Sequence, residues 1–265
     1  MIVSFDKQFL FVHIPKTAGT SLSSVLAPFR SQKAELYYYK VKNRLYQNQW
    51  FNPLSLLNPS LKPKYDEFNF YNHTHLTAAA AQKIIPSKVF NTLFKFAIVR
   101  HPIDWQYSMY RHILAKHKDS QYRHIYEPVF KHQTFADYIR WRIDTDFIAP
   151  QLFQIVDLSG KIIVDKVYRF ESLNSAFAEV SQRLNISAEL PRMNQGKPIR
   201  ENIDRHTKNL IFEHFKVDFT TFGYSQSSIN PDWILRPQPH SDLASQLKKL
   251  KIEDNRFSLW SKVDT

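Results

Sequence analysis

Short apolar segments alternate with amphipathic helical segments along this chain. Strands are predicted where aromatic and β-branched residues cluster, at residues 9–14, 68–72, 94–99 and 161–168. Helices are predicted at residues 20–26, from residue 77 across the following alanines, and at 103–117, 133–143, 172–184, 204–215 and near 241–252. Thr20 and Ser21 are predicted to cap the first of these helices, and Thr77 the second. Strands that alternate with helices favour a parallel sheet covered on both faces. We therefore predict an α/β fold with a central, mainly parallel sheet between helical layers.

The composition is that of an ordinary globular chain. Of the 265 residues, 43% are hydrophobic and 23% are charged, which argues against a disordered, collagen-like or coiled-coil protein. Cysteine is absent, so disulfides, thiolate zinc sites and cysteine nucleophiles are excluded. Residues 1–16 lack the pattern of a secretory signal, and no apolar stretch approaches the ~18 residues of a membrane span. We expect a cytoplasmic protein without a transmembrane segment.

The chain is strongly basic, with a formal net charge of +12. A field of this sign favours anionic partners such as phosphate or sulfate esters, acidic glycans, nucleic acid or anionic lipid. Residues 30–64 interleave cationic and aromatic side chains, which suits an acidic sugar chain, single-stranded nucleic acid or peripheral contact with a membrane. A solvated basic face over a local aromatic core explains this segment equally well. No specific nucleic-acid-binding motif is evident.

The segment HIPKTAGTS, residues 13–21, joins a predicted strand to a predicted helix. Backbone N–H groups at such a helix start point at an anion, and the helix dipole favours negative charge. Lys16 adds a cation, Thr20 and Ser21 add hydroxyl donors, and Gly19 permits a positive φ or close approach of a ligand. The pattern is not a Walker A loop, because Lys16 precedes the glycine. The alternative is a capped helix beside a surface lysine.

A second candidate anion site lies in IVRHPIDWQYSMY, residues 98–110. Arg100 ends a predicted strand, where ligands gather in open α/β sheets, and Ser108 lies on the next helix. A guanidinium fits phosphate oxygens well, and the serine adds a neutral donor. The alternative is a structural arginine with a packed serine. Two such elements on strand ends predict a ligand with two separate phosphate-like groups.

These motifs resemble those of the sulfotransferases that use 3′-phosphoadenosine 5′-phosphosulfate (PAPS), in the branch of the Golgi glycan sulfotransferases and their bacterial counterparts. HIPKTAGTS resembles the family's 5′-phosphosulfate loop, and VRHPIDWQYSMY its 3′-phosphate element. GKIIVDKVYRFESL resembles its strand with an Arg-Phe-Glu turn, and LPRMNQGKP with DFTTFGY its C-terminal closing loop and last helix. The likeness spans about residues 9–224. We expect a sulfotransferase domain over 1–224 and an extension over 225–265 packed on or near it.

The resemblance implies a P-loop-like three-layer fold that binds PAPS as co-substrate, without a metal. It implies that Lys16 meets the departing oxygen of the nucleotide while an acceptor hydroxyl attacks sulfur in line. The cofactor-binding residues that it implies are Pro15, Lys16, Thr17, Ala18, Gly19, Thr20, Ser21, Arg100, Ser108 and Asn194. One residue departs from the pattern, because Trp105 stands where the family often has arginine. This departure puts one charge contact near the nucleotide in doubt.

A histidine suits the general base, because its ordinary pKa lies near neutrality. His73 and His75 lie in NHTHLT, on one face at the end of the predicted second strand. The segment His75-Leu76-Thr77 resembles the family's base-bearing segment, so we expect His75 to be the base and His73 a helper or substrate contact. The alternatives are a structural pair and a metal pair, the latter weak without cysteine or paired carboxylates. His13 is expected to pack near the nucleotide or sheet, and Glu171 to form a buried ion pair with Arg169.

The sequence thus predicts a PAPS-dependent O-sulfotransferase, with a carbohydrate as the leading acceptor. A second hypothesis keeps this chemistry on a small metabolite or a lipid. A third is a basic nucleotide- or nucleic-acid-binding protein without catalysis, which has no use for Lys16 and His75 meeting at one sulfur atom.

Overall fold

A central sheet of four strands organises the computed structural model, which describes residues 1–31, 75–116, 134–145, 149–191 and 203–225. Its strands lie in the order β1 (Ile2–Ser4), β2 (Phe9–Val12), β3 (Phe94–Val99) and β4 (Lys166–Arg169). β1 pairs antiparallel with β2, whereas β2, β3 and β4 run parallel. β1 was not predicted, and the strand predicted at 68–72 lies outside the described residues. The strand predicted at 161–168 is shorter and ends one residue later, because residues 156 and 162 form only an isolated bridge.

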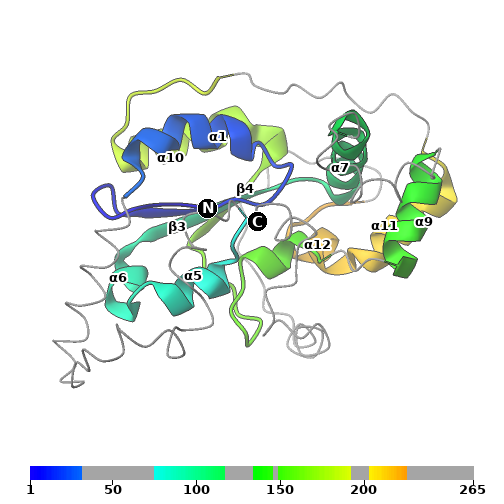
Figure 1. Ribbon diagram of the computed structural model, residues 1–265, viewed down its shortest axis with the longest axis horizontal. Helices are drawn as coiled ribbons and strands as arrows, with labels where there is room; N and C mark the ends of the chain where they lie inside the picture. Colours follow the sequence, from blue (N-terminus) through cyan, green and yellow to red (C-terminus); the bar gives the residue numbers. More distant parts are fainter. Residues whose placement is uncertain (32–74, 117–133, 146–148, 192–202, 226–265) are drawn as a thin grey trace.

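Alternating side chains of β2 divide the core into two clusters. Phe9 and Phe11 point to one face, where they pack with Phe96 against helices α1 (Gly19–Leu26) and α10 (Leu173–Leu184). Both helices lie on this side of the sheet (Figure 1). The phenylalanines of neighbouring parallel strands stack, with ring centroids of Phe11 and Phe96 5.2 Å apart. The alternating direction of the buried β2 side chains therefore decides which face receives which helices.

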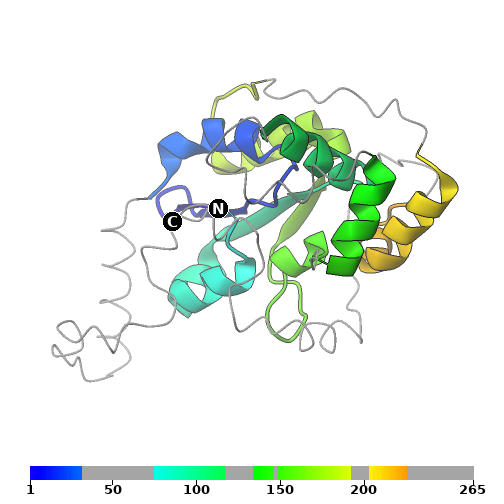
Figure 2. The same ribbon diagram turned by 45° about the vertical axis from the view of Figure 1, so that its right-hand side comes forward.

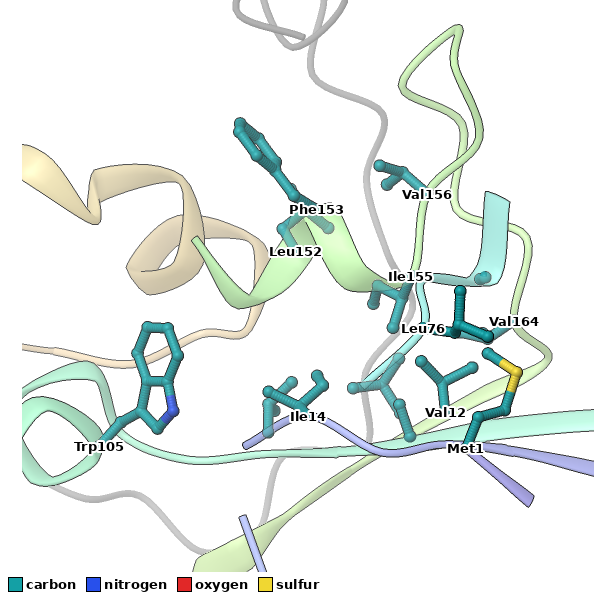
Figure 3. Packing of buried hydrophobic residues seen from close by; sticks show 14 of the residues in the cluster. Met1, Val12, Ile14, Leu76, Trp105, Leu152, Phe153, Ile155, Val156 and Val164 are labelled. Atoms are coloured by element: carbon teal, nitrogen blue, oxygen red, sulfur yellow. The ribbon is translucent and has the colours of Figure 1, made fainter. Parts of the chain in front are cut away.

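Leu10, Val12 and Ile14 point to the opposite face and enter the larger cluster. Figure 3 shows Val12 and Ile14 beside Leu76 and Ile155. The covering elements are α5 (Ala78–Ile84), α6 (Ser87–Thr92), the 3-10 turn η4 (Gln151–Gln154) and α12 (Lys216–Thr221). Helices α7 (Pro102–Lys116), α9 (Phe135–Thr145) and α11 (Arg205–His214) pack together at one end (Figures 1 and 2). The predicted α/β fold with a helix-flanked, mainly parallel sheet is confirmed.

A side-chain cap was predicted for α1 and for α5, and of these two predictions the one for α5 is confirmed. The Thr77 hydroxyl accepts a hydrogen bond from the Ala80 N–H at 3.1 Å, as predicted for α5. Asp204 likewise caps α11 by accepting from the Thr207 N–H at 2.8 Å. The cap predicted at Thr20 and Ser21 is wrong, because α1 already starts at Gly19 and Ala18 occupies the cap position without a side-chain bond. The two hydroxyls therefore lie inside the first turn of α1.

Two short elements complete the described chain, η1 (Ala27–Phe29) after α1 and η5 (Phe170–Ser172) after β4. In the part of the chain that the structure describes, no helix combines the length and apolar character needed to cross a membrane. Cytoplasmic residence and the helix near 241–252 stay predictions, as does the division of the chain at residue 224.

Candidate active site

The candidate site forms where the parallel strands end. β2, β3 and β4 are neighbours in the sheet, so their carboxyl ends open at one edge. β2 leads into the loop of residues 13–18, and β3 leads directly into Arg100. Ligands of open α/β sheets bind at this edge. The two sequence motifs, more than 80 residues apart, therefore lie side by side.

The loop of residues 13–18 before α1, which we call the cradle, has a backbone conformation that suits an anion. Lys16 and Ala18 have φ values of 64° and 66°, whereas Thr17 and Gly19 have negative φ. This alternation turns successive N–H groups toward a common point, and the start of α1 adds its dipole. A left-handed conformation costs a residue with a Cβ roughly 1–2 kcal/mol. Two such residues, separated only by Thr17, are typical of a loop that is held in shape for a ligand.

The loop is held from inside and from α7. The buried Thr17 hydroxyl donates to the Ile14 carbonyl at 2.9 Å, so this side chain stabilises the turn itself. The Trp105 indole N–H donates to the Pro15 carbonyl at 2.7 Å. Trp105 is buried in the larger core cluster (Figure 3). Its ring lies edge-on to the ring of Phe215. Trp105, the residue that departs from the resembled motif, thus ties the loop to α7 through its indole.

Gly19 is required by the close approach of His13. A Cβ built on Gly19 would lie 1.4 Å from His13 Nε2, which no real contact allows. A positive φ does not explain this glycine, because its φ is negative, and the group that approaches it is not a ligand. The close neighbour is a ring of the protein itself, so Gly19 makes room for His13. His13 is buried, and its Nδ1 has no hydrogen-bond partner.

His75 lies against His13. Its Nδ1 is 3.0 Å from the His13 carbonyl oxygen, and the two ring centroids are 4.5 Å apart. A carbonyl only accepts, so Nδ1 carries the proton and the neutral ring keeps its lone pair on Nε2. Burial lowers the pKa of His75 to about 4, and the positive charge of Lys16 acts in the same direction. His75 is therefore neutral at pH 7 and presents a proton acceptor.

Two cations lie together beside the cradle. Arg100 Nη1 donates to the Lys16 carbonyl at 3.5 Å, and the guanidinium lies 4.2 Å from the centroid of the Phe170 ring. Burial lowers the pKa of Lys16, and the charge of Arg100 lowers it further. Burial also lowers the pKa of Arg100, against the opposing effect of Asp104 and Glu171. An anion between Lys16 and Arg100 would relieve both effects.

The predicted site residues divide into three groups. Lys16, Gly19, Arg100 and His75 come together at the strand edge. Ser108 is partly buried on α7, and no hydrogen bond given for the described residues joins it to Arg100 or the loop. His73 and Asn194 lie outside the described residues, as does most of the basic segment 30–64. The roles assigned to all these residues stay predictions.

Arg169 and Glu171 hold the end of the described chain against the site. Arg169 Nη2 donates to the Phe222 and Gly223 carbonyls, the latter at 3.0 Å. Glu171 accepts from the Tyr224 hydroxyl at 2.9 Å and from the His101 N–H at 2.8 Å. The ion pair expected between Arg169 and Glu171 stays a prediction, beside the hydrogen bonds that both residues make to this segment. Both fix the turn after α12.

Sequence reasoning missed two polar residues behind Arg100. The Gln151 side chain bonds the main chain of Arg100, and the buried Asp218 accepts hydrogen bonds from Gln151 and Leu152. Burial raises the pKa of Asp218 to about 7, against the effect of these backbone donors. Neither residue belongs to a local motif, so no sequence signal connects them to Arg100.

Comparison with known proteins agrees with the two motifs. No curated protein and no solved structure matches the chain significantly. The model of the sulfotransferase family matches residues 1–225, which include the cradle, Arg100 and His75. This match covers most of the chain and all of the described strands. The chain therefore belongs to the sulfotransferase family.

Proposed function

We propose that this sulfotransferase moves a sulfuryl group from PAPS to an acceptor hydroxyl, with a carbohydrate as the leading acceptor. The observation that carries the proposal is the meeting of the cradle, two cations and a neutral imidazole at one strand edge. The family match supports a transferase of this class. A protein that only bound nucleotides would have no use for His75 next to Lys16.

The donor nucleotide has two anionic ends, and the site offers two cationic elements. Residues 15–21 would hold the 5′-phosphosulfate through backbone N–H groups and Lys16. Arg100, with Ser108, would hold the 3′-phosphate. The contact between Arg100 and the Lys16 carbonyl supports this division, because it sets the two elements next to each other.

The reaction forms a bond between the acceptor oxygen and sulfur and breaks the bond between sulfur and the bridging oxygen of the nucleotide. The acceptor proton passes to Nε2 of His75, and the electron pair leaves with the bridging oxygen. Lys16 stabilises the charge that grows on this oxygen. Positioning and electrostatic stabilisation dominate, as in the related transfer of phosphoryl groups.

The acceptor class rests on the sequence alone. The cationic and aromatic composition of residues 30–64 favours an acidic or sulfated sugar chain, and a small metabolite or lipid is the alternative. A sulfate-transfer screen of the full chain against glycans and small alcohols decides between them.

Nucleotide binding tests the donor assignment. Calorimetric titration should show that 3′-phosphoadenosine 5′-phosphate binds much more tightly than AMP or ATP, because only the former offers a 3′-phosphate to Arg100. Equal affinity for AMP would contradict the proposal.

A further inference from the structure

A side-chain amide continues the sheet where β4 stops pairing with β3. The parallel ladder between these strands ends at the pair Val99 and Arg169. At the next residue, Gln151 Oε1 accepts from the Arg100 N–H and Gln151 Nε2 donates to the Arg100 carbonyl, each at 2.8 Å. One side chain thus satisfies both polar groups of the Arg100 backbone. It takes the place that a neighbouring strand would occupy.

Gln151 is itself fixed from behind by Asp218. The Asp218 carboxylate accepts from the Gln151 N–H at 2.8 Å and the Leu152 N–H at 2.9 Å. Gln151 Nε2 lies 3.5 Å from the same carboxylate. Gln151 and Asp218 are both wholly buried, at 0% exposure, so water does not compete for these bonds. The first turn of η4 is therefore locked to α12.

Among the described residues, hydrogen bonds do little to hold the guanidinium of Arg100 in place. Its Nη1 reaches the Lys16 carbonyl only at 3.5 Å, and its buried Nε has no hydrogen-bond partner. Stacking on Phe170 restrains its plane without fixing its position along the ring. The direction of this side chain therefore depends on the backbone conformation at Arg100, which Gln151 sets.

We propose that Gln151, backed by Asp218, is a positioning residue that aims Arg100 at the 3′-phosphate of the donor nucleotide. These two residues, which we call the clamp, then determine how strongly the protein prefers a 3′,5′-diphosphate to a 5′-monophosphate. This inference rests on the proposed function, because it assigns the 3′-phosphate to Arg100. No hydrogen bond of the described residues joins Gln151 to the cradle for the 5′ end, so we expect binding of the 5′ end to depend little on Gln151.

The test compares Gln151→Met with a matched control in the full chain. Methionine has similar length but cannot bond both groups of the Arg100 backbone. Gln154 lies in the same turn, and no hydrogen bond of the described residues joins it to Arg100, so Gln154→Met is the control. We expect Gln151→Met to weaken binding of 3′-phosphoadenosine 5′-phosphate about tenfold and to leave AMP binding unchanged. The loss is smaller than that from removing Arg100, because the charged hydrogen bond to the 3′-phosphate is weakened and not abolished. Gln154→Met should change neither affinity.

A double-mutant cycle separates positioning from general destabilisation. In an Arg100→Ala background, Gln151→Met should have no further effect on either nucleotide, because the group that it positions is absent. Asp218→Asn is the second variant and should shift the same preference in the same direction, which keeps the test decisive if Gln151→Met does not fold. Thermal denaturation of each variant reports folding.

Three results would overturn the inference. Gln151→Met could weaken AMP and the diphosphate equally, or it could weaken binding further in the Arg100→Ala background. Either outcome means a structural role only. In the third result, the wild type prefers the diphosphate to AMP, and folded Gln151→Met and Asp218→Asn keep the same preference. This result overturns the positioning role of Gln151 and leaves the proposed function intact. A wild type without preference removes the proposed function itself.

Discussion

The indole N–H of Trp105 donates a 2.7 Å hydrogen bond to the carbonyl of Pro15. This bond links the first turns of α7, which follow Arg100, to the cradle that precedes α1. The two proposed nucleotide-binding elements are thereby joined before any ligand arrives.

Trp105→Phe should weaken nucleotide binding while it preserves most of the core packing. The phenyl ring can still lie against Phe215, but the Pro15 carbonyl loses its donor, so we expect a loss of about 1 kcal/mol in stability. Urea denaturation and calorimetric titration measure the two effects. Trp141→Phe, on α9, is the control and should leave nucleotide affinity unchanged.

Lys16→Ala should reduce turnover more than it reduces nucleotide affinity. The contact between the Lys16 ammonium group and the leaving oxygen strengthens as charge develops on this oxygen. Loss of the ammonium group therefore destabilises the transition state more than the bound nucleotide. Steady-state kinetics and calorimetry on the same preparation make the comparison. A variant with normal turnover and weak nucleotide binding would show that Lys16 only binds.

His75→Ala should lower turnover roughly 10²–10⁴-fold, the usual contribution of a general base. Nucleotide affinity should stay near that of the wild type, because the imidazole is proposed to face the acceptor. His73→Ala should cost less, and a chelator should have no effect. If His75→Ala is fully active while His73→Ala or His13→Ala is inactive, the base has been misassigned.

Stability should fall as the pH is lowered from about 6.5 toward 4. The pKa of His75 is about 4 in the folded protein and near 6.5 in the unfolded chain, so the unfolded chain binds the extra proton in this window. The stabilising contribution of the neutral ring is complete above about pH 6.5, and about 3 kcal/mol is lost by pH 4. Urea denaturation at several pH values should give a shallower pH dependence for His75→Leu than for the wild type. Equal slopes would contradict the lowered pKa.

Gly19→Ala should destabilise the protein by about 1–3 kcal/mol, the range for an overpacked site. The added methyl group would collide with the His13 ring, which must rotate out of its place. Thermal denaturation measures the loss. Thr20→Ala changes the exposed next residue and should have little effect, and equal stability of the two variants would rule out the close approach.

Strands and site loops that depend on a short stretch of sequence could be predicted. The apolar runs at 9–14 and 94–99 predicted β2 and β3, and the motifs that follow these runs predicted Lys16, Gly19 and Arg100 as site residues. β1 was not predicted, because three residues followed by a turn are too few to show periodicity. It is a strand because Ile2 and Ser4 pair with Phe11 and Phe9 on β2.

Long-range polar contacts could not be predicted. Gln151 is 51 residues from Arg100, and Asp218 a further 67 residues on, so only the fold brings them together. The place of His75 near the loop was predicted, but its hydrogen bond to the His13 carbonyl was not. The periodicity of a sequence indicates the side of a strand to which a residue points, but it does not identify the group that the residue contacts. The resemblance also left open what Trp105 does in place of an arginine.

The position of the His13 ring, with Gly19 on one side and His75 on the other, has a kinetic consequence. A donor bound in the proposed cradle would lie against the Gly19 backbone, which touches the His13 ring, and this ring contacts the imidazole proposed to serve the acceptor. The two substrates would then not load independently. We expect a sequential order of addition in which the nucleotide enters first and sharpens the affinity for the alcohol that follows.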